Sequence, residues 1–145
     1  GDGIIPKLTL PDFATAEQAE RGLRLIEEHL DTTEIDADGR QNLYGLQRLV
    51  IGTVVDSGEA LVMRLPRRQT RGRPGLQVKV MEPDYLDGTR DGPLAAGDGG
   101  WVYEGIEYGA DGRRVAYWLY DQHPGTNSWG QSRFSAISRR VPASE

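Results

Sequence analysis

Residues 106–120 read IEYGADGRRVAYWLY, and this stretch decides the fold class of the 145-residue chain. Isoleucine, valine and tyrosine favour pleated backbone, which predicts strands at 106–108 and 115–120. Between them lies the pair Asp111-Gly112, which is typical of a type I′ turn because such a turn needs two residues with positive φ. The stretch therefore predicts an antiparallel hairpin.

A second hairpin is predicted upstream, from strands at 59–65 and 76–81, where the second strand alternates apolar and polar residues. Its connection, residues 66–75, contains four arginines, two prolines and two glycines, which is typical of a mobile, solvated loop. The rest of the C-terminal half is predicted to contain loops at 88–100 and 121–138 and a short edge strand at 139–142.

Two helices are predicted before these strands. The first begins at Thr15, because Thr15 and Gln18 have the spacing of a capping box, and it ends near residues 31–33. His29 falls on its mostly charged side and is expected to be exposed. The apolar stripe of this helix consists of Ala19, Leu23, Ile26 and Leu30.

The second helix follows a turn at 36–39 and ends at Ser57-Gly58, where glycine suits the left-handed position after a helix. Asp38 or Asn42 is expected to cap its first turn. Residues 34–39 also match the first half of a calcium loop, but Gly45 stands where the twelfth position needs a bidentate glutamate. A capping turn is therefore the preferred interpretation.

Helices that come first and antiparallel strand pairs that follow indicate an α+β fold. We expect two N-terminal helices followed by a small, bent, mainly antiparallel sheet or a partial barrel. The expected organisation is a single domain over residues 1–145, mainly helical at 1–58 and mainly β with long loops at 59–145.

The composition is that of an ordinary soluble globular domain, with 37% hydrophobic and 27% charged residues. The sequence contains no cysteine, which excludes thiolate nucleophiles, cysteine-based metal sites and disulfides. No apolar run approaches the roughly eighteen residues of a membrane span. The start has neither an initiating Met nor the pattern of a signal peptide, so the chain is expected to be a piece of a longer protein.

Basic residues are concentrated in one stretch. The chain has 17 basic and 22 acidic residues, and its net charge of −5 argues against wrapping nucleic acid over the whole surface. Residues 64–79 nevertheless carry +6, which leaves −11 on the remainder. A solvated loop is the usual meaning of such a run, and contact with phosphates is the alternative.

The sequence contains no complete catalytic constellation. His123 lies close to Asp121, which could orient its imidazole, so a small hydrolase using His123 with nearby carboxylates is one interpretation. Packing within a loop is the simpler one. No metal or cofactor site is indicated. Six aromatic residues are expected to form a core with cross-strand pairs rather than a stacking platform: Trp101, Tyr103, Tyr108, Tyr117, Trp118 and Tyr120.

Five blocks of sequence between residues 34 and 143 resemble, in order and at plausible spacing, the N-terminal region of the lambda-type family of tailed-phage portal proteins. No single block is as specific as the series. The resemblance is carried by residues 36–40, 43–50 and 57–62, by 76–78 and 82–87, by 105–108, 111–113 and 115–118, by 123–125, and by 140–143.

The resemblance implies a mechanical role without enzymatic activity or a cofactor. Portal subunits assemble into a ring, usually of twelve, at one vertex of the capsid. The terminase motor drives double-stranded DNA in through this ring, and the DNA leaves through it at infection. The implied partners are other copies of the subunit, the terminase large subunit, capsid and head-completion proteins and passing DNA, without a membrane.

Family members continue beyond the last block, so the chain is expected to be a fragment from the outer, wing-like body of a subunit in the virion, assembled in the host cytoplasm. An acidic body beside a basic stretch suits head-to-tail contacts between subunits. A free-standing nucleic-acid binding module is a further alternative. The residues expected to contact DNA or another subunit are Arg64, Arg67, Arg68, Arg71 and Arg73.

Overall fold

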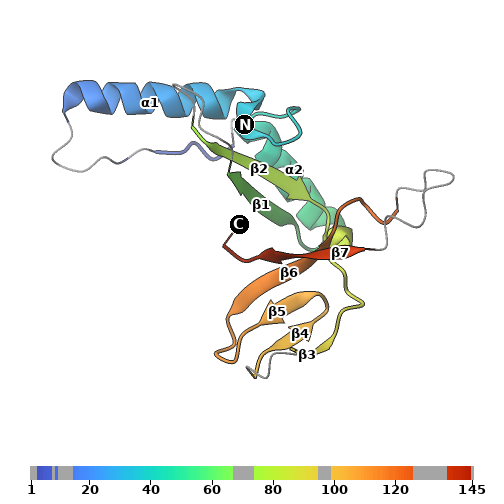
Figure 1. The fold of residues 1–145 in the computed structure, drawn as a ribbon. Coiled ribbons are helices and arrows are strands. Elements are labelled where there is room, and N and C mark those ends of the chain that lie inside the picture. Colours follow the sequence, from blue (N-terminus) through green and yellow to red (C-terminus); the bar gives the residue numbers. More distant parts are fainter. Residues whose placement is uncertain are drawn as a thin grey trace. The chain divides into compact units, whose positions relative to one another are not determined.

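Two α-helices precede all the strands in the computed structural model, which describes residues 3–7, 9, 15–66, 74–94, 99–125 and 137–144 (Figure 1). The described strands form a two-stranded and a five-stranded antiparallel sheet, and neither closes into a barrel. The predicted α+β class is confirmed. The chain divides into two compact units, unit 1 at residues 1–81 and unit 2 at residues 82–145. The expected single domain over residues 1–145 stays a prediction.

Helix α1 (Ala16–Asp31) starts with the predicted capping box. The Thr15 hydroxyl accepts from the Gln18 N–H at 3.2 Å, and the Gln18 side chain accepts from the Thr15 N–H at 2.9 Å. The buried stripe differs from the predicted one, because Leu23 is exposed and His29 is buried. The His29 Nε2 donates to the Leu76 carbonyl oxygen at 2.8 Å, which explains how a polar ring occupies the inner face.

The connection from α1 to α2 is organised by the Asp36 carboxylate. After the short 3₁₀-helix η1 (Thr33–Ile35), Asp36 accepts the backbone N–H groups of Asp38, Arg40 and Gln41 at 2.9–3.0 Å. Burial alone would raise the pKa of Asp36, but these backbone donors hold it below its usual value. Both carboxylate oxygens of Asp36 are therefore engaged by backbone donors of the turn.

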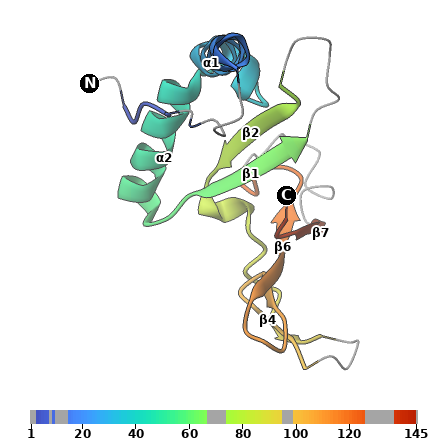
Figure 2. The same ribbon diagram turned by 90° about the vertical axis from the view of Figure 1, so that its left-hand side faces the viewer.

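Helix α2 (Leu43–Ser57) is bounded by the predicted residues. The Asn42 side chain accepts from the Gly45 N–H at 3.0 Å, and Gly58 ends the helix with φ of 84°. Beside the helix lies the hairpin of β1 (Leu61–Pro66) and β2 (Leu76–Met81) (Figure 2). The second strand is confirmed, whereas the first begins two residues later than predicted. Most of the predicted connecting loop lies outside the described residues.

In unit 1, one face of the β1–β2 hairpin lies toward α2. The register places Val62 opposite Val80 and Arg64 opposite Val78, so the three valines share one face of the sheet. The described apolar residues that are buried in unit 1 are Ile35, Leu46, Met63 and Met81.

Unit 2 begins with the 3₁₀-helix η2 (Pro83–Tyr85) and contains a five-stranded sheet in which neighbouring strands follow chain order. Its outer strand β7 confirms the predicted edge strand, and β3 lies inside the stretch predicted to be a loop. The core of the sheet consists of Val102, Ala116, Leu119 and Val141. The strands are β3 (Gly92–Pro93), β4 (Trp101–Tyr103), β5 (Ile106–Tyr108), β6 (Arg114–Tyr120) and β7 (Ser138–Pro142).

The predicted hairpin between β5 and β6 is confirmed, but the type I′ turn assigned to it is wrong. Gly112 has a φ of 75°, whereas Asp111 does not have positive φ, and the Gly112 N–H donates to the Gly109 carbonyl at 2.9 Å. The loop is longer than two residues, so it needs only one left-handed position. The adjacent pair with positive φ is Glu104 at 46° and Gly105 at 81°, which join β4 to β5.

The Gly105 position gives a first testable prediction. A Cβ at Gly105 would lie 2.7 Å from the Asp87 carbonyl oxygen, whereas a Cβ at Gly112 would meet nothing within 4 Å. Both glycines have positive φ, so each alanine variant carries a conformational cost of about 1–2 kcal/mol. We expect Gly105→Ala to lower the free energy of unfolding of unit 2 by about 1–3 kcal/mol more than Gly112→Ala, because of the clash.

Urea unfolding followed by tryptophan fluorescence measures this difference, because all three tryptophans, at 101, 118 and 129, belong to unit 2. An equal decrease in the free energy of unfolding in the two variants would show that the contact with Asp87 does not constrain the turn.

Candidate functional site

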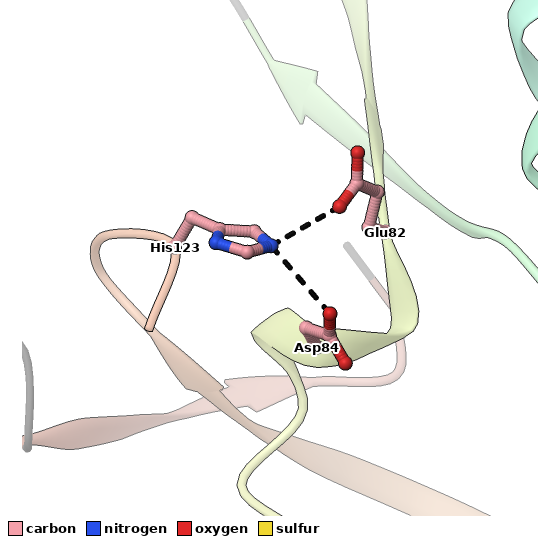
Figure 3. Close-up of side chains that lie close together, drawn as sticks. All are labelled: Glu82, Asp84 and His123. Atoms are coloured by element: carbon pink, nitrogen blue, oxygen red, sulfur yellow. Dashed lines mark hydrogen bonds and ion pairs between the residues drawn. The ribbon is translucent and has the colours of Figure 1, made fainter. Parts of the chain in front are cut away.

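His123 lies between two carboxylates at the surface of unit 2. Its Nε2 is 3.1 Å from Glu82 Oε2 and 3.7 Å from Asp84 Oδ2 (Figure 3). Glu82 immediately precedes η2 and Asp84 lies within it, whereas His123 follows β6. The Tyr85 ring packs edge-on against the imidazole, with 5.4 Å between ring centres. The structure thus brings His123 together with nearby carboxylates.

The carboxylate predicted to orient His123 was the wrong one. Asp121 pairs instead with Arg139, with 2.7 Å between Oδ1 and Nε. Asp121 directly follows β6 and Arg139 lies in the neighbouring strand β7, so strand pairing determines this contact. The true partners of His123 are 41 and 39 residues away along the chain, at Glu82 and Asp84.

The hydrogen bonds of His123 define its tautomer when the ring is neutral. The Gly125 N–H donates to Nδ1 at 2.9 Å, so Nδ1 is the acceptor and the ring proton resides on Nε2, which donates to Glu82. A Cβ on Gly125 would lie 2.9 Å from the ring carbon Cε1. The His-Pro-Gly block therefore forms a turn that folds tightly around the imidazole.

This arrangement does not suit metal binding or general-base catalysis. One ligand atom from each of Glu82, Asp84 and His123 lies within 4.8 Å of the others. A histidine ligand binds a metal through its unprotonated nitrogen and donates its other N–H to an acceptor, whereas here the unprotonated Nδ1 faces an N–H donor. The Glu82 and Asp84 side chains are also 61% and 70% exposed, so water reaches the cluster.

A second cluster in unit 2 surrounds the buried carboxylate of Asp87, which is 5% exposed. It accepts hydrogen bonds from the hydroxyls of Ser138, of Thr89 at 2.6 Å and of Tyr120 at 2.8 Å, and the Arg90 Nε lies 3.3 Å away. Burial would raise the pKa of Asp87, but the hydroxyl donors, Ser138 first, lower it from 3.8 to about 2. This carboxylate ties the segment after η2 to β6 and β7.

The buried Glu107 forms a third polar contact in the same sheet. Both of its oxygens accept from the Arg140 guanidinium at 2.8 Å, which joins β5 to β7 across β6. The hydrogen bonds from Arg140 hold the pKa of Glu107 below its usual value against the opposing effect of burial. The Arg90 guanidinium lies 3.9 Å from the centre of the Trp118 ring, a cation–π contact. These charges stabilise the sheet.

The structure describes only part of the predicted arginine site. Arg64 is exposed on β1, whereas Arg67, Arg68, Arg71 and Arg73 lie outside the described residues. Their role in contacting DNA or another subunit stays a prediction.

Each polar cluster of unit 2 thus connects strands and turns, as expected of a structural module. The chain matches the family model of the phage portal proteins of the lambda family over residues 1–145, and it belongs to this family. A probable portal protein of Halomonas phage phiHAP-1 is 32% identical over 110 residues, which cover 76% of this chain. The matched part is 20% of the relative's length. The resemblance stated from the sequence blocks is confirmed.

Among the described residues, no helix combines the length and the apolar character that crossing a membrane requires.

The Asp87 cluster generates a pH-dependence prediction. The folded-state pKa of about 2 lies below the ordinary 3.8, so the stabilisation is present above pH 4 and is lost as the pH falls through 2. The shift corresponds to about 2 kcal/mol.

We expect Asp87→Asn to lower the stability of unit 2 at pH 7 and to flatten its pH dependence between about 4 and 2. Fluorescence-monitored urea unfolding tests this, with exposed Glu104→Gln as control. An unchanged acid profile in Asp87→Asn would contradict the assignment.

The His123 hydrogen bonds predict the ring's tautomer. Long-range ¹H–¹⁵N NMR correlation spectra of the neutral ring should show a protonated Nε2 and an unprotonated Nδ1, and stoichiometric Zn²⁺ should leave these signals in place. A Gly125→Ala variant should displace the ring and change the Nδ1 shift. A zinc-induced shift confined to His123 would refute the tautomer argument.

Proposed function

We propose that this chain is part of a structural subunit of the portal ring at the capsid vertex and that it has no enzymatic activity. The observation that carries the proposal is the family match, which extends over all 145 residues. The ring would form the conduit through which double-stranded DNA is packaged and ejected, and it would dock the terminase motor. Twelve copies, together with capsid and head-completion proteins as further partners, belong to the same proposal.

The chemistry of unit 2 supports a structural role. Asp87 and Glu107 are buried but are held ionised by their hydrogen-bond donors, so neither is available as a general acid near neutral pH. His123 donates Nε2–H to Glu82 at an exposed site, which gives no support to the small-hydrolase alternative.

A genetic experiment in the encoding phage tests the proposal. A nonsense codon early in the gene should give heads without DNA, because an incomplete ring cannot pass the genome. Antibodies raised against the 145-residue chain should label one vertex of each virion, where the tail attaches. DNA-filled heads without the protein, or labelling of all vertices, would reject the proposed role.

The arginine stretch gives a separate prediction for this function. The stretch at 64–79 carries +6 against −11 elsewhere, so this part of the sequence offers a concentration of positive charge to neighbouring subunits or DNA phosphates. Charge reversal at Arg67, Arg68, Arg71 and Arg73 should weaken ring assembly or DNA packaging. Lysine at all four positions should retain most of the assembly and packaging. Electron microscopy of rings and DNA measurement in heads provide the readouts. Normal rings with normal DNA content after charge reversal would discard this role.

A further inference from the structure

Helix α2 lacks the charged outer face that an exposed helix normally carries. Only Arg48 and Asp56 are charged among its 15 residues, and its exposed positions include Leu49, Ile51, Val54 and Val55. Ile51 is 63% and Val55 78% exposed. A helix that is apolar on nearly all sides is normally buried on all sides. The outer face of α2 therefore has the composition of an interface.

Beside this face lies an apolar groove of about 400 Å³, formed by α2, the segment around Ile4 and the valine face of the hairpin. Ile51, Val62 and Val80 are among its walls, and Val62 is 56% exposed. The Ile4 backbone is held to α2 by two hydrogen bonds with the Gln47 amide, at 2.7 and 2.8 Å. The groove thus has a defined shape.

Gly52 supports the close approach of a partner to the outer face of α2. It is exposed next to Ile51 in the helix interior, where glycine costs about 1 kcal/mol relative to alanine. A Cβ there would meet nothing within 4 Å in the described part of the chain. A partner that packs closely on α2 is the kind of contact that a missing side chain permits.

Unit 2 has a different exposed apolar patch, on strand β4. Trp101 and Tyr103 lie two residues apart, so they share one face of the sheet, and they are 49% and 56% exposed. Tryptophan and tyrosine are the side chains that most often fill a pocket at the centre of an interface. The two exposed aromatic side chains of this patch are therefore suited to fill an aliphatic groove.

The charges beside the two patches are opposite. Arg48 lines the groove, and Glu104 follows Tyr103 in the turn between β4 and β5. Within the described ranges, both side chains are exposed and neither has an ion-pair partner. Opposite charges at the rims of two apolar patches fix the register in which the patches meet.

We propose that the α2 groove of one copy of this chain receives Trp101 and Tyr103 from a second copy, with Arg48 facing Glu104. The inference deepens the proposed function and rests on it, since a ring requires contacts between two different surfaces of each subunit. The α2 groove and the β4 patch are two different surfaces of this kind. A patch that paired with itself would give a closed dimer instead.

Complementation between two variants tests the head-to-tail contact. The wild-type chain should self-associate with rising concentration in sedimentation velocity. Ile51→Glu, which blocks the groove, and Tyr103→Glu, which blocks the patch, should each weaken association at least about tenfold. An equimolar mixture should form a 1:1 pair, because the first variant keeps an intact patch and the second an intact groove.

The matched control is Leu23→Glu on α1, which also places a charge at an exposed apolar residue and should leave association unchanged. Circular dichroism of each variant checks the fold. A monomeric wild type, association unaffected by both variants, or a mixture that stays monomeric would overturn the proposed contact.

A charge exchange tests the register. Arg48→Glu and Glu104→Arg should each weaken association severalfold, and the chain carrying both should recover it, because every contact again joins opposite charges. The double variant failing to recover would overturn the register assigned to Arg48 and Glu104.

These outcomes are separable from the proposed function. A wild-type chain that stays monomeric rejects this contact and leaves the vertex labelling unaffected. DNA-filled heads without the protein reject the portal role and leave the measured self-association intact.

Discussion

The buried carboxylate of Asp87 needs donors on every side, and unit 2 is arranged to supply them. A charge in a low-dielectric interior is tolerated only where hydrogen bonds replace the water it has lost. Thr89 supplies a hydroxyl from the same turn, Tyr120 supplies one from β6, and Ser138 supplies one from β7, 51 residues along the chain. One side chain therefore links the segment after η2 to both of the last two strands.

The same principle operates at shorter range in unit 1. Asp36 obtains its donors from backbone N–H groups within five residues, so this turn is determined locally. Glu107 is intermediate, because its donor Arg140 comes from two strands away in the sheet. In the described part of the chain, each buried acid joins separate segments, and these segments lie further apart in the sequence where the donors are more distant.

Local features of the fold were predictable and distant ones were not. The Thr15–Gln18 capping box, the Asn42 cap and the Gly58 stop each depend on residues within one helical turn. The capping box and the stop are predicted correctly from the sequence, and Asn42 is one of the two caps that the sequence offers. The turn assigned to Asp111-Gly112 failed because dipeptide identity does not reveal loop length, whereas Glu104-Gly105 is the true two-residue connection. His29 was misplaced because its acceptor, the Leu76 carbonyl, belongs to a strand 47 residues away.

The polar clusters show the same limit. The spacing of Asp87 and Thr89 is typical of a side-chain-capped turn, so part of that cluster had a sequence signal. Nothing local indicates that Ser138 completes it, or that Glu82 rather than Asp121 meets His123.

The separation of Asp87 from Ser138 also orders events during synthesis. All the elements of unit 1 end at Met81, so this unit can complete its packing while the ribosome is still translating the second half. Unit 2 is completed later, because its central carboxylate lacks the Ser138 hydroxyl, one of its three hydroxyl donors, until β7 has emerged. Unit 1 can therefore pack before unit 2, whose sheet is complete only once β7 pairs with β6.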